Sequence, residues 1–460
     1  MSVLSLLFSQ LLALALGASV IALFVRGGPG AIATIAAYGY VLGAIAITVI
    51  LRLLSVGGIQ WNFWLLALIT IALTAIASVR ARREWLKAPK APAAKELHWQ
   101  RTLTAAFWAL IAVHVALAFN EALLRPLFPW DAAAQWATKA RVWFEYRRIV
   151  PFVDDMAWIG AAGNVFTDAH PTYPGTVPLL QVWAALAWGR FDDDVINVAW
   201  PLFLAALPIG VYGQLRRLGF AALPAAAVAY MIASLPFVDV HAALAGYADL
   251  ALCVVYAFAL LALATWTREP SRGNALLLAA CAAVLPVLKT PGWIWLATLM
   301  PGVIAVYVPR KTLGILAAAG ALAIATLLAY VSYVHPITIL GYQVALQHNR
   351  IADAVFSNLF LFANWHLLGF LIPLALFVAH RAMFAPAMLA LTIVAGTAII
   401  ALIAVFFFSS ASVEGVGAYT AVNRAMLHVV PAFIAYTALL LREYWIIRLS
   451  AARDVAMANA

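Results

Sequence analysis

Long apolar runs separated by short polar segments fill most of this chain. About 20 apolar residues are enough to cross the hydrocarbon core of a bilayer as a helix. The runs therefore predict an all-α bundle of about thirteen transmembrane spans, with eleven as the lower limit. Charge, proline or glycine bounds each expected span. The spans are residues 3–25, 31–54, 61–79, 103–124, 195–214, 222–236, 246–266, 274–289, 292–308, 312–334, 356–379, 384–408 and 425–441.

Composition supports a membrane environment along the whole chain. Hydrophobic residues make up 66% and charged residues 10% of the 460 residues, whereas soluble domains are about 25% charged. The run from Met1 to Val25 lacks the basic start and cleavage site of a signal peptide, so it is predicted to remain as the first helix. Cys253 and Cys281 both lie in apolar runs, so neither a disulfide framework nor a cysteine-based zinc site is expected.

The distribution of basic residues predicts the orientation. Residues 80–101 contain seven of the 28 Lys and Arg residues, so the positive-inside rule places this loop in the cytoplasm. The long segment 125–194 is then external. The net charge of +10 reflects this topology, and no nucleic-acid partner is expected. Three parts follow: residues 1–102, three helices plus the basic loop; residues 103–441, the main membrane module; and residues 442–460, a short cytoplasmic tail.

The external segment contains six tryptophans, which favour the membrane interface. At its start, Asp131 is placed to cap a helix on which Gln135 and Lys139 follow at spacings of four, on one face. An amphipathic helix lying on the membrane is therefore expected. The structural interpretation is a capped helix with a snorkelling lysine, and the functional one is a polar site at the membrane surface. The expected apolar face consists of Trp136, Ala140 and Trp143.

Two further polar clusters are expected on the same side. In residues 168–175, His170 and Tyr173 could bind a hydroxyl group or a cation, or the segment could be a proline-stiffened loop. In residues 241–250, His241 and Tyr247 precede Asp249, a carboxylate at the mouth of a span. Such a carboxylate is costly unless it is paired or functional, although a helix cap is the competing interpretation.

Basic residues expected on the external side form a fourth group of candidate residues. Lys139, Lys289 and Arg424 run against the positive-inside trend, so an anionic partner such as a phosphate is expected for some of them. Pairing with the acidic residues 192–194 or with lipid head groups is the alternative. The chain has no Walker-type loop, no dinucleotide-binding fingerprint and no His-Glu-x-x-His motif. Nucleotide chemistry is therefore not expected.

The chain resembles the GT-C class of integral-membrane glycosyltransferases in four stretches and in their order along the sequence. Within that class it is similar to the bacterial relatives of protein mannosyltransferases and of lipid A aminoarabinose transferase. The resemblance covers about residues 103–441. The stretches are PWDAAAQWATKA, HPTYPGTVPLL, GYADLAL and NRAMLHVVP.

The resemblance implies an inverting transfer of a sugar from a polyprenyl-phosphate-linked donor. The acceptor is a glycan, a lipid or a protein on the periplasmic side of the bacterial inner membrane. Asp131 is expected to be the base, and Asp249 either orients the acceptor or helps hold a divalent cation, the one cofactor that the resemblance allows. Partners are the donor, the acceptor and membrane lipids. The donor phosphate is assigned to Lys289, Arg424 and Lys139, and further substrate contacts to His170, Tyr173, His241 and Tyr247.

A polytopic transporter or lipid-glycan flippase is the alternative function. Transporters commonly carry ionisable residues near the middle of the membrane, on broken helices. Here the acids are expected at one face of the membrane, with His114 as the main exception within a span. This distribution favours the transferase.

Overall fold

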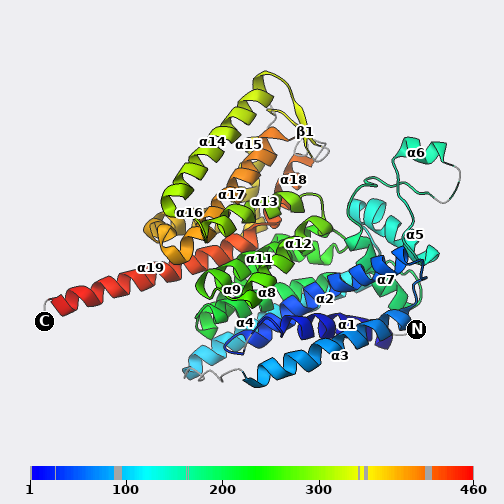
Figure 1. The fold of residues 1–460 in the computed structure, drawn as a ribbon, viewed down its shortest axis with the longest axis horizontal. Helices are drawn as coiled ribbons and strands as arrows, with labels where there is room; N and C mark the ends of the chain where they lie inside the picture. The colour runs from blue at the N-terminus through cyan, green and yellow to red at the C-terminus, as the bar shows by residue number, and fades with distance from the viewer. Residues whose placement is uncertain are drawn as a thin grey trace. The chain divides into compact units, whose positions relative to one another are not determined.

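The computed structural model describes residues 3–25, 27–87, 96–161, 163, 165–339, 342–346, 351–409 and 417–458. These residues form an all-α protein with one two-stranded hairpin (Figure 1). The chain divides into two compact units. Unit 1 contains the described parts of residues 1–234, 238–265 and 271–292, and unit 2 those of residues 235–237, 266–270 and 293–460.

Unit 1 is built from long apolar helices and a set of shorter helices, most of which lie between α4 and α8 in the chain. Its long helices are α1 (Val3–Ile21), α2 (Ala31–Val56), α3 (Phe63–Lys87), α4 (His98–Leu124), α8 (Ala199–Arg217), α11 (Ala248–Arg268, whose end belongs to unit 2) and α12 (Arg272–Leu288). The shorter ones are the π-helical turn η1 (Ala132–Ala137), α5 (Thr138–Tyr146), α6 (Asp155–Gly160), α7 (Thr176–Trp188), α9 (Ala222–Ala233) and α10 (Pro236–Ala243).

Unit 2 combines long spans with interrupted helices. Its long helices are α14 (Arg310–Tyr333), α17 (Pro386–Phe408) and α19 (Val430–Ala458). The shorter elements are α13 (Gly292–Ala305), α15 (Ile351–Phe356), η2 (Ser357–Leu361), η3 (Ala363–Trp365), α16 (Leu368–Val378), η4 (His380–Phe384) and α18 (Gly417–Leu427). Strands β1 (Ile337–Ile339) and β2 (Tyr342–Val344) pair antiparallel, with Thr338 opposite Gln343.

The all-α membrane architecture is confirmed, but thirteen continuous spans are not shown. Among the described residues, eight helices are long and apolar enough to cross a membrane. Counting α9 and α10 as one span bent by 60° gives nine. The expected span 356–379 is divided among η2, η3 and α16, and the expected span 425–441 between α18 and α19.

Two polar segments are more helical than the sequence analysis expected. The basic loop predicted at 80–101 is mostly the end of α3 and the start of α4, and its residues 88–95 lie outside the described part of the chain. The predicted tail from residue 442 continues α19 as far as Ala458. Lys, Arg and Glu are good helix formers, so a change from apolar to charged residues does not by itself end a helix.

Helices α1, α2 and α3 lie side by side, and glycines bring α1 and α2 into backbone contact (Figure 1). A Cβ atom on Gly17 would overlap the carbonyl oxygen of Gly39, and one on Gly43 would overlap that of Ala13. Lipid tails are as apolar as leucine, so close packing of this kind is a main source of helix association in membranes. Within the same unit, every residue from 248 to 265 of α11 is buried.

Replacing Gly17 by leucine should separate α1 from α2, because its side chain has no room between the two backbones. Overpacking typically costs about 1–3 kcal/mol, and a backbone clash falls at the upper end or above it. The thermal midpoint of the detergent-purified Gly17→Leu protein should therefore fall. The matched control is Gly314→Leu in α14, where a Cβ atom meets nothing within 4 Å. Equal midpoints for the two variants would contradict the glycine contact.

Candidate functional site

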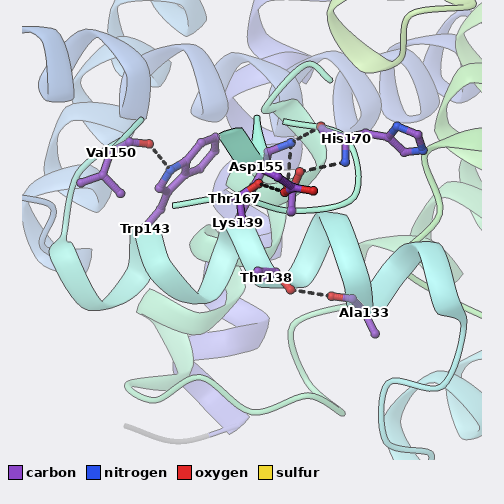
Figure 2. Close-up of polar contacts among 9 residues, drawn as sticks. Ala133, Thr138, Lys139, Trp143, Val150, Asp155, Thr167 and His170 are labelled. Atoms are coloured by element: carbon purple, nitrogen blue, oxygen red, sulfur yellow. Dashed lines mark hydrogen bonds and ion pairs between the residues drawn. The ribbon is translucent and has the colours of Figure 1, made fainter. Parts of the chain in front are cut away.

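Asp131 lies at the head of η1, but its side chain does not cap the helix. Its backbone is already helical, with φ −61° and ψ −36°, and its carboxylate accepts no capping hydrogen bond. The predicted capping role is therefore wrong. The turn that follows is π-helical, and the hydroxyl of Thr138 donates to the carbonyl oxygen of Ala133 at 2.8 Å (Figure 2). Single π-helical turns of this kind occur frequently at functional sites.

The prediction of a membrane-facing helix is also wrong, because the segment that contains Gln135 and Lys139 is buried in protein. Gln135 and Lys139 are each 1% exposed, and Trp136 is fully buried. Ala140 and Trp143, on the predicted apolar face, are buried as well. Both η1 and α5 pack against α7, which covers the surface that was expected to meet lipid. The lysine therefore does not snorkel to a membrane surface.

Lys139 instead holds the loop at residues 168–173. Its Nζ lies 3.0 Å from Oδ2 of Asp168 and donates to the carbonyl oxygen of His170 at 2.7 Å (Figure 2). The second oxygen of Asp168 accepts from the backbone N–H of His170 at 2.9 Å. Burial lowers the pKa of Lys139, and the hydrogen bond and charge of Asp168 oppose that shift. The ion pair thus keeps a cation in a place where water is excluded.

Three aromatic rings stack beside this pair. The ring centroids of Trp136 and Tyr173 are 5.5 Å apart, and those of Tyr173 and His170 are 4.6 Å apart with an angle of 16° between the planes. Trp136 is buried, Tyr173 is half-buried and His170 is exposed. The stack therefore runs from the protein interior to the surface. The structure brings His170 and Tyr173, both predicted substrate contacts, into direct contact with each other.

Asp249 and Lys289 form a second buried ion pair. Asp249 lies in the first turn of α11, and its Oδ1 accepts from Nζ of Lys289 at 2.8 Å. The side chains of these two residues are 0% and 8% exposed. Lys289 follows α12 and begins a tight turn in which the N–H of Gly292 donates to its carbonyl oxygen at 2.8 Å. Lys289, predicted to bind the donor phosphate, thus has a carboxylate partner within unit 1.

The turn before α11 packs against η1. Gly246 adopts a φ of +107°, and a Cβ atom there would lie 2.6 Å from Cβ of Ala132, the residue after Asp131. The carbonyl oxygen of the adjacent Tyr247 accepts from the indole of Trp200 at 2.8 Å. The rings of Tyr247 and the buried His241 have centroids 5.6 Å apart. Three of the four predicted stretches therefore meet in unit 1.

The fourth stretch lies in unit 2, where α18 carries the half-buried Arg424. Met426, two residues further along this helix, lines an apolar cavity of about 420 Å³. Trp365 also lines the cavity, and its indole donates to Oδ1 of Asn423 on α18 at 3.3 Å. The other lining residues come mainly from η2, α16, α17 and α19, and include Phe360, Leu368, Gly396, Ile399, Phe406 and Phe433.

Several of these features were missed by the sequence analysis. Asp168 was not assigned a role, because it lies 29 residues after Lys139 and no helical spacing links the two residues. The cavity joins segments that are up to about 80 residues apart, and no local pattern links them. No group of three or more His, Cys, Asp or Glu side chains that could hold a metal ion occurs in the part of the chain described here.

Comparison of the chain with protein-family models, with curated proteins and with solved structures finds no match. The chain is a polytopic helical membrane protein by its helix lengths and composition. Any more specific function has to be argued from its residues.

Removing one partner of the Asp249–Lys289 pair should destabilise unit 1 strongly. Lys289→Met leaves a buried carboxylate without its cation, and loss of one partner of a buried pair typically costs about 3–5 kcal/mol. The double variant Asp249→Leu/Lys289→Met removes both charges and should recover most of that loss. Thermal midpoints of the purified variants measure both effects. A double variant no more stable than Lys289→Met would show that the two side chains do not depend on each other.

Proposed function

We propose that this protein is a membrane glycosyltransferase. It moves a sugar from a polyprenyl-phosphate-linked donor to a glycan, lipid or protein acceptor at the non-cytoplasmic face of a membrane. The observation that carries the proposal is the apolar cavity of unit 2, together with a cation, Arg424, on one of the helices that line it. A donor of this class has the same two parts, an apolar chain and a phosphate.

The cavity suits the chain of such a donor. Its volume of about 420 Å³ falls within the range of about 300–1,000 Å³ that is usual for small-molecule sites. Its lining is almost wholly apolar, so an isoprenoid chain would gain the free energy of leaving water, about 0.8 kcal/mol for each buried CH₂ group. Arg424 then offers a planar guanidinium, which binds phosphate oxygens in pairs.

Asp131 is assigned as the general base. Its carboxylate is half-buried at the head of η1, a single π-helical turn of the kind that occurs frequently at functional sites. In the proposed reaction the acceptor hydroxyl attacks the anomeric carbon while the bond from that carbon to the phosphate oxygen breaks. The hydroxyl proton passes to Asp131, and the polyprenyl phosphate leaves with its negative charge. A single displacement of this kind inverts the configuration at the sugar. Asp249, held by Lys289, is assigned to keep the α11 turn in place.

A transporter of lipid-linked glycans is the second candidate, and one pair of residues favours it. His114 lies near the middle of α4, and its Nδ1 is 2.7 Å from Oδ2 of Asp239 in α10. Both side chains are partly exposed, and α10 belongs to the span bent by 60°. Ionisable residues inside the membrane, especially on broken helices, often mark a transport pathway.

The Asp131→Asn variant tests the base. Because Asn has nearly the same size and shape as Asp, the thermal midpoint should change little, whereas loss of a general base lowers the rate by about 10²–10⁴-fold. The assay follows sugar transfer from a polyprenyl-phosphate donor by purified protein in lipid vesicles. The matched control is Asp154→Asn, because Asp154 does cap α6, accepting from the N–H of Ala157 at 2.9 Å.

Three outcomes separate the candidates. Transfer lost in Asp131→Asn and kept in Asp154→Asn supports the base. Transfer by Asp131→Asn at the wild-type rate would remove Asp131 from the chemistry. Movement of the intact donor across the vesicle membrane without sugar transfer, abolished by His114→Asn, would favour the transporter instead.

Filling the cavity should weaken use of long-chain donors selectively. Gly396 lines the cavity, and a Cβ atom there meets nothing within 4 Å, so Gly396→Leu occupies the space without a clash. The KM for a long-chain donor should rise about tenfold, since burial of a few CH₂ groups is lost. A short-chain donor that does not reach the cavity should be unaffected. Gly320→Leu in α14, also in open space, is the control. Equal KM values for both chain lengths would exclude the cavity as the donor site.

A further inference from the structure

The ammonium group of Lys139 is fully engaged inside the protein. Two of its contacts are polar, the carboxylate of Asp168 at 3.0 Å and the carbonyl oxygen of His170 at 2.7 Å. A third is the ring of Phe152, whose centroid lies 5.6 Å from Nζ. An ammonium group has three N–H donors. With its side chain 2% exposed, Lys139 is placed to organise the protein and not to bind a donor phosphate, the role expected from the sequence.

The group that Lys139 and Asp168 organise is His170. The carbonyl oxygen of His170 accepts from Lys139 and from the backbone N–H of Tyr173 at 3.1 Å, while its own N–H donates to Asp168. The backbone N–H and the backbone carbonyl of His170 are therefore both held by hydrogen bonds. Figure 2 shows the imidazole pointing away from the ion pair. The ring is exposed, yet its backbone is held by a buried charge pair.

The exposed imidazole rests on a rigid base. One of its faces stacks on Tyr173, which in turn stacks on the buried Trp136. A flat, fixed ring with one face open is suited to the apolar C–H face of a pyranose, because aromatic rings bury apolar area at little entropic cost. The imidazole nitrogens can also exchange hydrogen bonds with sugar hydroxyls.

We propose that the Lys139–Asp168 pair is a positioning device that holds the His170 imidazole, on the Tyr173–Trp136 stack, as the contact for a sugar ring of the substrate. This inference rests on the proposed glycosyltransferase function and deepens it. His170 touches the sugar, and Lys139 and Asp168 act through His170. The sugar belongs either to the donor or to the acceptor, and both present the same pyranose chemistry.

The first test uses kinetics. His170→Ala should raise the KM for one substrate about fivefold to tenfold, the size of one aromatic contact, with little change in kcat. The substrate whose KM changes identifies the source of the sugar. His170→Phe keeps a flat ring and should restore most of the loss. His98→Ala, an exposed histidine at the start of α4, is the control.

A double variant separates positioning from folding. Lys139→Met/Asp168→Leu removes both buried charges together, so it avoids leaving one charge unpaired. It should reproduce the KM change of His170→Ala, and adding His170→Ala to it should give no further change. Additive effects in the triple variant would mean that the pair does not act through His170.

A binding measurement keeps the inference separate from the transfer reaction. Saturation-transfer NMR with a panel of methyl pyranosides should show contact with the wild-type protein and loss of that contact in His170→Ala. If the wild type transfers sugar but His170→Ala changes neither the KM values nor the NMR contact, the inference is wrong and the proposed function stands. If the contact depends on His170 but no sugar is transferred, the sugar site stands and the proposed reaction fails. Absence of contact in the wild type would overturn the inference.

Discussion

A lysine that is shut off from water needs a carboxylate beside it, and this requirement shapes the polar part of unit 1. Lys139 joins α5 to the loop that contains Asp168, and Lys289 joins the end of α12 to the start of α11. Each pair links segments that are far apart in the sequence and fixes a turn that apolar packing alone would leave unspecified. Breaking such a pair is far more costly than forming it is favourable, so each pair specifies one arrangement strongly.

These pairs also divide the charged residues by task. A cation that is neutralised inside the protein contributes a fixed shape to the loop or turn that it holds. Lys139 and Lys289 are cations of this kind. Asp131, on its π-helical turn, and Arg424, on a cavity-lining helix, are the residues to which we assign chemistry. Fixed neighbours let such groups act without reorganisation, which is the main way that enzymes stabilise developing charge.

The helical membrane fold could be predicted because a span leaves a local signal of about 20 apolar residues. The interruptions of the spans could not be predicted. Residues 356–379 contain no Asp, Glu, Lys or Arg, yet His366 adopts a φ of +51° between η3 and α16 and the helix is broken there. Asp131 shows the same limit. An acid before three alanines suits a cap and a π-helical turn equally, and only the backbone angles distinguish them. The partner of Lys139 lies 29 residues further along the chain, beyond any helical spacing.

The burial of the Lys139–Asp168 pair has a consequence for the conditions under which the protein works. Dissolved salt screens exposed charges over about 8–10 Å at physiological ionic strength, but it acts much less on pairs that ions cannot approach. Surface pairs such as Arg190–Asp192, in which the arginine is 72% exposed, should loosen as ionic strength rises. The loop held by Lys139 should not. The geometry of this loop therefore stays constant when the ionic strength of the surrounding medium changes.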